Sequence, residues 1–290
     1  MVGSGARTSG DLVERARSGD RLAVARLLSI VEDGGPELAA VADAVFPHTG
    51  AAFTIGITGA PGAGKSTLTE ALIGVARAEG HRVAVLAVDP SSPFTGGALL
   101  GDRVRMQSHA TDDHVFIRSM ATRGHLGGLS LATPQAVRVL DAAGNAYIIV
   151  ETVGVGQAEV DIAGTADTTL VVVNPGWGDS VQAGKAGLLE VADVFIVNKA
   201  DRSGAGAAVR ELQQMIHLGP YRAWQPPIVE TIATRGDGVA ELWEAVGKHR
   251  AYLEASGELG SRRRARLAEE ISSIVAARVR ARVHRNASGD

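Results

Sequence analysis

The segment Gly59-Ala60-Pro61-Gly62-Ala63-Gly64-Lys65-Ser66 constrains the fold of this chain more than any other. It follows an apolar stretch at residues 54–58, which predicts a strand, and it leads into residues 66–79, which have the pattern of a helix. A glycine-rich turn between a strand and a helix surrounds an anion with backbone N–H groups. We expect Lys65 to reach the β- and γ-phosphate oxygens of a nucleotide, and the Ser66 hydroxyl to bind Mg²⁺. The alternative is a turn that binds nothing, and the strand–loop–helix context argues against it.

The chain after residue 51 alternates apolar runs with longer helical patterns. Strands are expected at residues 53–58, 82–88, 147–150, 169–173, 194–197 and 228–231, and helices at 66–79 and 239–253. Such alternation is typical of βαβ units. We therefore predict an α/β fold, a P-loop NTPase with a mostly parallel central sheet flanked by helices.

Helical additions are expected at both ends of this unit. Amphipathic patterns at residues 11–30 and 36–45, with a Gly-Gly-Pro breaker at 34–36, predict a helical N-terminal extension. After Gly260 comes an arginine-rich segment whose apolar residues recur every four positions, at Leu267, Ile271, Val275, Val279 and Val283. We divide the chain into an N-terminal extension (1–50), a P-loop domain (51–255) and a C-terminal helical arm (256–290).

A second loop, Asn198-Lys199-Ala200-Asp201, directly follows the apolar residues 195–197. The carboxyl ends of strands are where open α/β sheets expose ligand contacts. Asp201 can accept hydrogen bonds from the N1–H and N2 amine of guanine, whereas adenine would leave this carboxylate unpaired. Lys199 can lie along the base and Asn198 can brace a neighbouring loop, so we expect GTP rather than ATP. A further base-contacting loop is expected after residues 228–232, at Ala233, Thr234 and Arg235.

A carboxylate for the metal is expected from the apolar segment at residues 147–150, which delivers Glu151 to the phosphate end. Ras-type enzymes have Asp at this position and a water-orienting Gln directly after the glycine. Here the residue after Gly154 is not Gln, and we do not transfer that role to the nearby Gln157. Asp89 and Asp102 are further candidates for Mg²⁺ or for the hydrolytic water. The alternative for both is capping and turn chemistry.

Residues 59–67, 88–92, 100–102, 151–157, 179–185 and 198–201 together resemble the MeaB/ArgK/MMAA family of SIMIBI-class G-protein chaperones. The resemblance covers most of residues 10–255. It implies a GTPase that serves an adenosylcobalamin-dependent acyl-CoA mutase, such as methylmalonyl-CoA mutase, by gating cofactor loading and by protecting or reactivating the mutase. It also implies homodimerisation through the C-terminal arm and a third switch loop that relays the nucleotide state to the mutase.

The resemblance also implies roles for individual residues. The phosphate-binding set is Gly59, Ala60, Pro61, Gly62, Ala63, Gly64, Lys65, Ser66 and Thr67. The base site is Asn198, Lys199, Asp201, Ala233, Thr234 and Arg235, where the family commonly has Ser-Ala in place of Ala233-Thr234. The residues around Mg²⁺ are Ser66, Asp89, Asp102 and Glu151, and the catalytic set is Lys65, Asp89, Asp102 and Glu151. The switch residues are Gln157, Asp179, Gln182 and Lys185, and a solvated helix start is the alternative for the last three.

Composition limits the partners and the compartment. The chain has no cysteine, so disulfides and thiolate metal sites are impossible, and a reducing cytoplasm is the expected location. The sequence contains no long apolar run free of charged residues, so we expect neither a membrane span nor a signal peptide. The arginines of the C-terminal segment lack aromatic neighbours for base stacking and lie beside an apolar stripe, so no nucleic-acid partner is expected.

Two other function classes stay open beside GTP hydrolysis by a mutase chaperone. A P-loop kinase acting on an amino-acid transport component would need an acceptor site, and the sequence shows no clear one. A metallochaperone GTPase would need metal ligands, and the histidines are scattered without cysteine.

Overall fold

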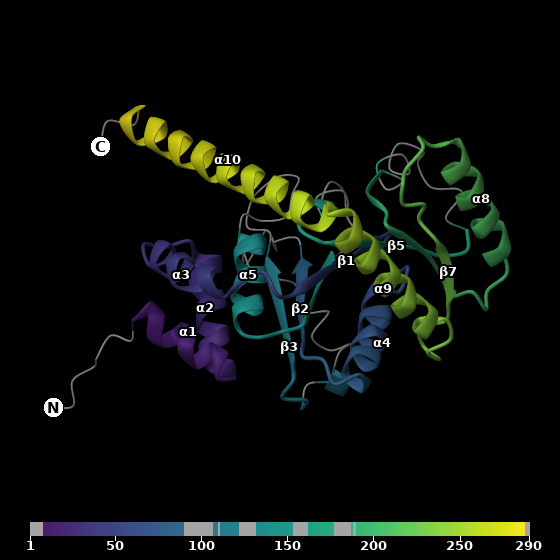
Figure 1. Ribbon diagram of the computed structural model, residues 1–290, viewed down its shortest axis with the longest axis horizontal. Coiled ribbons are helices and arrows are strands. Elements are labelled where there is room, and N and C mark those ends of the chain that lie inside the picture. The colour runs from purple at the N-terminus through teal and green to yellow at the C-terminus, as the bar shows by residue number, and fades with distance from the viewer. Residues whose placement is uncertain are drawn as a thin grey trace.

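A seven-stranded parallel sheet forms the centre of the computed structural model, which describes residues 8–89, 107–109, 111–121, 132–152, 162–176, 187 and 190–287 (Figure 1). The strand order is β3-β2-β4-β1-β5-β6-β7. The strands are β1 (Phe53–Gly59), β2 (Val83–Asp89), β3 (Val115–Ala121), β4 (Tyr147–Thr152), β5 (Thr168–Val173), β6 (Val194–Asn198) and β7 (Ile228–Thr231). All paired neighbours are parallel, which confirms the predicted α/β fold.

Helices cover both faces of the sheet because successive strand residues point to opposite sides. On one face, Ile149 of β4 packs in a core with α4 (Lys65–Ala78) and α9 (Val239–Ser256). On the other face, Ile148 packs with α5 (Ala132–Ala142), and Phe195 of β6 packs with α8 (Ala205–Leu218). Short 3₁₀ helices complete the connections: η1 (Phe46–His48), η2 (Gln107–His109) and η3 (Ile162–Gly164).

The N-terminal region holds three helices, α1 (Ser9–Arg17), α2 (Arg21–Asp33) and α3 (Leu38–Val45), which share a core with α5. The single pattern expected over residues 11–30 is divided between α1 and α2. Gly19 has a φ of 96° between them, and the Asp20 carboxylate accepts the N–H groups of Leu22 (2.9 Å) and Ala23 (3.1 Å). An N-terminal cap starts a new helix at this point. The domain boundaries at residues 50 and 255 stay predictions.

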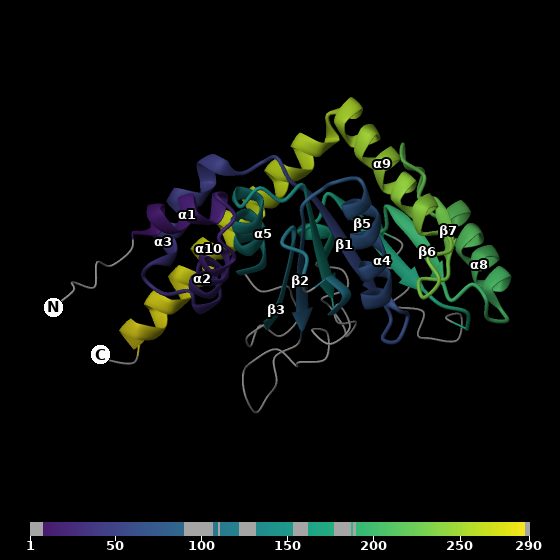
Figure 2. The same cartoon turned by 90° about the horizontal axis from the view of Figure 1, so that it is seen from below.

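The C-terminal helix α10 (Glu258–Ala287) turns away from α9 at Gly257, whose φ is 73°. It extends along the molecule past α5 (Figures 1 and 2). In Figure 2 the arrowheads of β2, β3 and β6, which mark the carboxyl ends of these strands, point away from the corner between α9 and α10. Arg263 holds α10 to the sheet by donating to the Asp167 carboxylate, with Nη2 2.6 Å from Oδ2. Arg266 pairs with the same carboxylate. These arginines are therefore bound to the body of the protein itself.

No helix in the described part of the chain combines the length and the apolar character that a membrane crossing requires.

Candidate functional site

The phosphate loop connects β1 to α4 at the carboxyl edge of the sheet, and two of its glycines are required by close contacts. Gly59 has a φ of 135°, and a Cβ there would stand 2.0 Å from the backbone oxygen of Val172 in β5. Gly64 has a φ of 96°, and a Cβ there would stand 2.3 Å from Nδ2 of Asn198. A side chain at either position would push the loop off its neighbours. The absence of a side chain at Gly59 and Gly64 therefore lets the loop pack closely against β5 and against Asn198.

Lys65 starts α4 and directs its ammonium group back over this loop. Its Nζ donates to the backbone oxygens of Gly59 (2.7 Å) and Ala60 (3.2 Å), and the residue is only 7% exposed. A compact ammonium in a glycine-rich loop at the N-terminus of a helix makes an electropositive site. The loop is therefore suited to a polyphosphate.

Ser66 and Glu151 meet beside the phosphate loop. The Ser66 hydroxyl donates to Oε1 of Glu151 at 2.7 Å, and Glu151 is 1% exposed. A hydroxyl and a carboxylate are hard oxygen donors, which is the set that Mg²⁺ prefers, with its other ligands coming from water and phosphate. Ser66 and Glu151, two of the four predicted metal residues, thus have the chemistry that the ion requires. Asp89 ends β2, which pairs with β4, so the backbone places it at the same edge.

The structure adds Thr69, which the sequence analysis missed, to this group. The Thr69 hydroxyl donates to Oε2 of Glu151 at 2.8 Å, so both carboxylate oxygens bind hydroxyls of α4. Residues three apart on a helix share a face, and Ser66 and Thr69 have this spacing. That spacing was the signal available in the sequence.

Asn198 joins the phosphate loop to the base loops. Its Nδ2 donates to the backbone oxygen of Ala63 at 2.8 Å. Its Oδ1 accepts from the Thr231 hydroxyl (3.1 Å) and from the Ala233 backbone N–H (3.2 Å). One buried amide thus connects three segments that are far apart in the sequence. Ala233 takes part through its backbone, while Thr234 is exposed.

Lys199 and Asp201 line the outer part of this loop. Lys199 has a φ of 59°, the one positive φ of a non-glycine residue in the described ranges, and its Nζ donates to the Gly62 oxygen at 2.6 Å. Such strain costs about 1–2 kcal/mol and is common at functional sites. The Asp201 side chain is 49% exposed and lies 4.0 Å from Nη2 of Arg235. Its carboxylate is therefore accessible to a base.

The remaining predicted residues can be placed only in part. Thr67 is half-buried on α4. Five predicted residues lie outside the described ranges: Asp102, Gln157, Asp179, Gln182 and Lys185.

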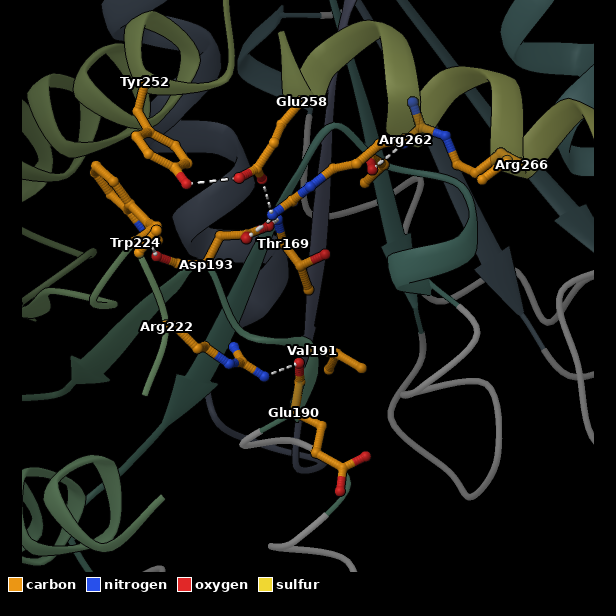
Figure 3. Close-up of a pocket in the computed structure, with 13 residues that line it drawn as sticks. Thr169, Glu190, Val191, Asp193, Arg222, Trp224, Tyr252, Glu258, Arg262 and Arg266 are labelled. Carbon is orange, nitrogen blue, oxygen red and sulfur yellow. Dashed lines mark hydrogen bonds and ion pairs between the residues drawn. The ribbon is translucent and has the colours of Figure 1, made fainter. Parts of the chain in front are cut away.

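A separate cavity of about 580 Å³ lies at the opposite, amino edge of the sheet, where β5, β6, α9 and α10 meet (Figure 3). Its charged groups bind one another: Arg262 lies between Asp193 (3.1 Å) and Glu258 (3.4 Å), and Glu258 accepts the Tyr252 hydroxyl at 2.6 Å. Behind them, burial lowers the pKa of His249, more strongly than the nearby Asp193 carboxylate raises it. Because Arg262 and Glu258 of α10 bind Asp193 and Tyr252 here, we interpret this region as the contact that holds α10, not as a second ligand site.

Comparison with known proteins gives consistent results. The family described as "Methylmalonyl Co-A mutase-associated GTPase MeaB" matches residues 24–288. A putative GTPase of Pyrococcus horikoshii is 54% identical over 96% of this chain and 89% of its own length. GTPase ArgK of Escherichia coli is 39% identical over 87% of this chain and 79% of its own length. A solved structure titled "LAO/AO transport system kinase" superposes with a TM-score of 0.77 at 29% identity, over 96% of this chain and 86% of that one.

Proposed function

This chain belongs to the MeaB family of methylmalonyl-CoA mutase-associated GTPases, and from this premise we propose that its GTP hydrolysis serves an adenosylcobalamin-dependent acyl-CoA mutase. In this role the protein gates loading of the B12 cofactor and protects or reactivates the mutase. The family description supports a mutase of the methylmalonyl-CoA type as the partner. The GTP site itself rests on one observation, the Asn198 amide that joins the phosphate loop to both base loops.

The described residues divide the work of the nucleotide site. Lys65 and the backbone of residues 59–66 bind the phosphates. Asp201 selects guanine by accepting hydrogen bonds from the N1–H and N2 amine of the base. Ser66 and Glu151 would hold Mg²⁺, which when bound neutralises charge on the phosphate oxygens. Asp89 and Asp102 stay candidates for the metal shell or for the attacking water. We assign Gln157, Asp179, Gln182 and Lys185 to the switch segments that report the nucleotide state.

We further propose that the protein works in the cytoplasm as a homodimer joined through α10. Four apolar side chains of this helix, spaced four residues apart, are more than half exposed: Ile271 (54%), Val275 (55%), Val279 (56%) and Val283 (60%). A continuous apolar stripe on an otherwise polar helix is typical of a helix–helix interface.

The mutase proposal can be tested by co-purification. Methylmalonyl-CoA, isobutyryl-CoA and 2-hydroxyisobutyryl-CoA mutases would each be incubated with the protein, once with GDP and once with a non-hydrolysable GTP analogue. We expect one mutase to be retained in a manner that depends on the nucleotide, and its cofactor loading to follow GTP hydrolysis. The Lys65→Ala variant serves as the control that binds nucleotide poorly. Retention of none of the mutases with either nucleotide would contradict the proposal.

A phosphotransferase is the second candidate, favoured by the similarity of this chain to a solved transport system kinase. Incubation with GTP labelled at the γ-phosphate separates the two functions. A chaperone GTPase transfers the label to water as inorganic phosphate. Label that appears instead on a protein acceptor would favour the kinase and overturn the chaperone proposal.

A further inference from the structure

Glu151 is held at both carboxylate oxygens by hydroxyl groups of one helix. Ser66 donates to Oε1 at 2.7 Å and Thr69 donates to Oε2 at 2.8 Å. All three residues are buried, with exposures of 7%, 0% and 1% for Ser66, Thr69 and Glu151. Ser66 also belongs to the phosphate loop, whereas Thr69 lies one turn deeper in α4. Thr69 therefore contacts the carboxylate from the side away from the phosphates.

The length of the Glu151 side chain explains why a second hydrogen bond, from the Thr69 hydroxyl, is needed to orient its carboxylate. Glutamate has one more rotatable bond than aspartate, so a carboxylate at its end needs an additional contact to stay in one orientation. A hydrogen bond from Ser66 restrains the carboxylate at one oxygen and by itself still allows rotation about the Cγ–Cδ bond of Glu151. A second donor on the other oxygen removes this freedom, and a pair of hydroxyls three residues apart on one helix face provides it.

The single proton of Thr69 has two acceptors within reach. Its Oγ1 lies 3.0 Å from the backbone oxygen of Lys65 and 2.8 Å from Oε2 of Glu151. A carboxylate is the stronger acceptor, because hydrogen bonds to charged groups are shorter and stronger than those to neutral carbonyls. The proton therefore points to Glu151.

We propose that Thr69 is a positioning residue for the magnesium site, which fixes the Glu151 carboxylate beside Ser66 without touching the nucleotide. This inference rests on the proposed Mg²⁺-dependent GTP site. Groups that orient metal ligands from outside the coordination shell commonly change metal affinity by about 10- to 100-fold. Loss of the Thr69 hydroxyl should therefore weaken the response to Mg²⁺ and leave metal-free nucleotide binding intact.

The test measures release of a fluorescent GDP analogue at increasing free Mg²⁺, and its affinity in EDTA. For Thr69→Val we expect half-maximal slowing of release to need about 10-fold more Mg²⁺ than in the unmodified protein. The affinity in EDTA should stay within about 2-fold, because the phosphate and base contacts remain. Thr69→Ser, which keeps the hydroxyl, should restore the Mg²⁺ response.

Thr152→Val is the matched control, since it removes a buried hydroxyl next to Glu151 in sequence. Thr152 is 0% exposed, and its hydroxyl faces Thr58 (3.3 Å) instead of the carboxylate. Thermal unfolding of each variant verifies that it is folded. In a Glu151→Gln background, Thr69→Val should cause no further change, because the positioned group is already altered.

The possible failures are distinguishable. If GDP release from the unmodified protein does not respond to Mg²⁺, the proposed metal site fails, and the role of Thr69 fails with it. If the unmodified protein responds and Thr69→Val responds equally, only the Thr69 proposal is overturned. An equal loss in Thr69→Val and Thr69→Ser, or in Thr152→Val, would assign the effect to packing and would also overturn it.

Discussion

Lys65 supplies the positive charge of the phosphate loop, and its removal tests the loop directly. In Lys65→Ala the β- and γ-phosphates lose their cationic partner, so we expect GTP hydrolysis to fall by about 100-fold or more and nucleotide affinity to fall with it. Phosphate release and fluorescent-nucleotide binding measure the two effects. Lys248→Ala is the control, because Lys248 is exposed and pairs with Glu244 on α9 at 2.9 Å. Unchanged turnover in Lys65→Ala would contradict the assignment.

Asp201 is expected to determine the choice of base. Replacement by Asn exchanges one of the two carboxylate oxygens that accept from the guanine N1–H and N2 amine for an NH₂ donor, and we expect GTP affinity to drop roughly 100-fold. Xanthosine triphosphate carries a carbonyl in place of the N2 amine and should bind the variant better than it binds the unmodified protein. Competition binding with GTP and xanthosine triphosphate measures this change of base preference. Asp237→Asn serves as control, since Asp237 lies near the same Arg235 at 3.4 Å. An unchanged preference for GTP over xanthosine triphosphate in Asp201→Asn would argue against the role of this loop in base recognition.

The phosphate loop (59–66) and the base loop (198–201) could be predicted from sequence because each is a local motif placed directly after an apolar strand. Thr69 could not be predicted with the same ease, since its partner Glu151 is 82 residues away. The contacts of Asn198 with Ala63 and Ala233 likewise depend on three strands ending at one edge of the sheet. Motifs therefore identify the chemistry, while the tertiary fold determines which side chains support it.

At the scale of elements, Asp167 holds α10 to the start of β5. Burial alone would raise the pKa of Asp167, but Arg263, Arg266 and the Thr54 N–H lower it below its ordinary value of 3.8. A lowered pKa means that this carboxylate stabilises the fold fully above about pH 4, and that the contribution is lost as the pH falls below that value. Acid therefore weakens the attachment of α10.

Asp167→Asn should deprive Arg263 and Arg266 of the carboxylate that they share and lower the free energy of unfolding at pH 7 by about 3 kcal/mol. The difference from the unmodified protein should shrink as the pH falls below 4. Denaturant unfolding at pH 7 and at pH 3 measures both effects. Glu269→Gln, on an exposed part of α10, is the control. An equal loss at both pH values would show that the charge of Asp167 is not responsible.

The strand β3 shows where sequence patterns fail at this scale. It was not predicted, because Arg118 and Ser119 interrupt its apolar run. In the structure Arg118 donates to the backbone oxygen of Ala25 (3.2 Å) and pairs with Glu32, both in α2. A charged side chain inside this strand is therefore balanced by a helix distant in the sequence, and no local pattern contains that information.

At the scale of the whole molecule, the nucleotide site and α10 occupy opposite edges of one sheet. Asp167 and Asp193, which hold arginines of α10, directly precede β5 and β6. The carboxyl end of β6 carries Asn198, the amide that joins the nucleotide loops. Changes along the exposed stripe of α10 should therefore alter assembly while the nucleotide site stays intact.

This separation allows the proposed dimer to be tested alone. We expect a mass in solution of twice the 29.9 kDa chain, and a single-chain mass after Val275→Arg with Val279→Arg. Two arginines in an apolar helix interface should raise the dimer dissociation constant by roughly 100-fold or more. Light scattering coupled to size exclusion measures the mass, and GDP affinity should not change. Glu269→Arg, outside the apolar stripe, should leave the dimer intact. A single-chain mass for the unmodified protein, or an undisturbed dimer in the double variant, would contradict assembly through α10.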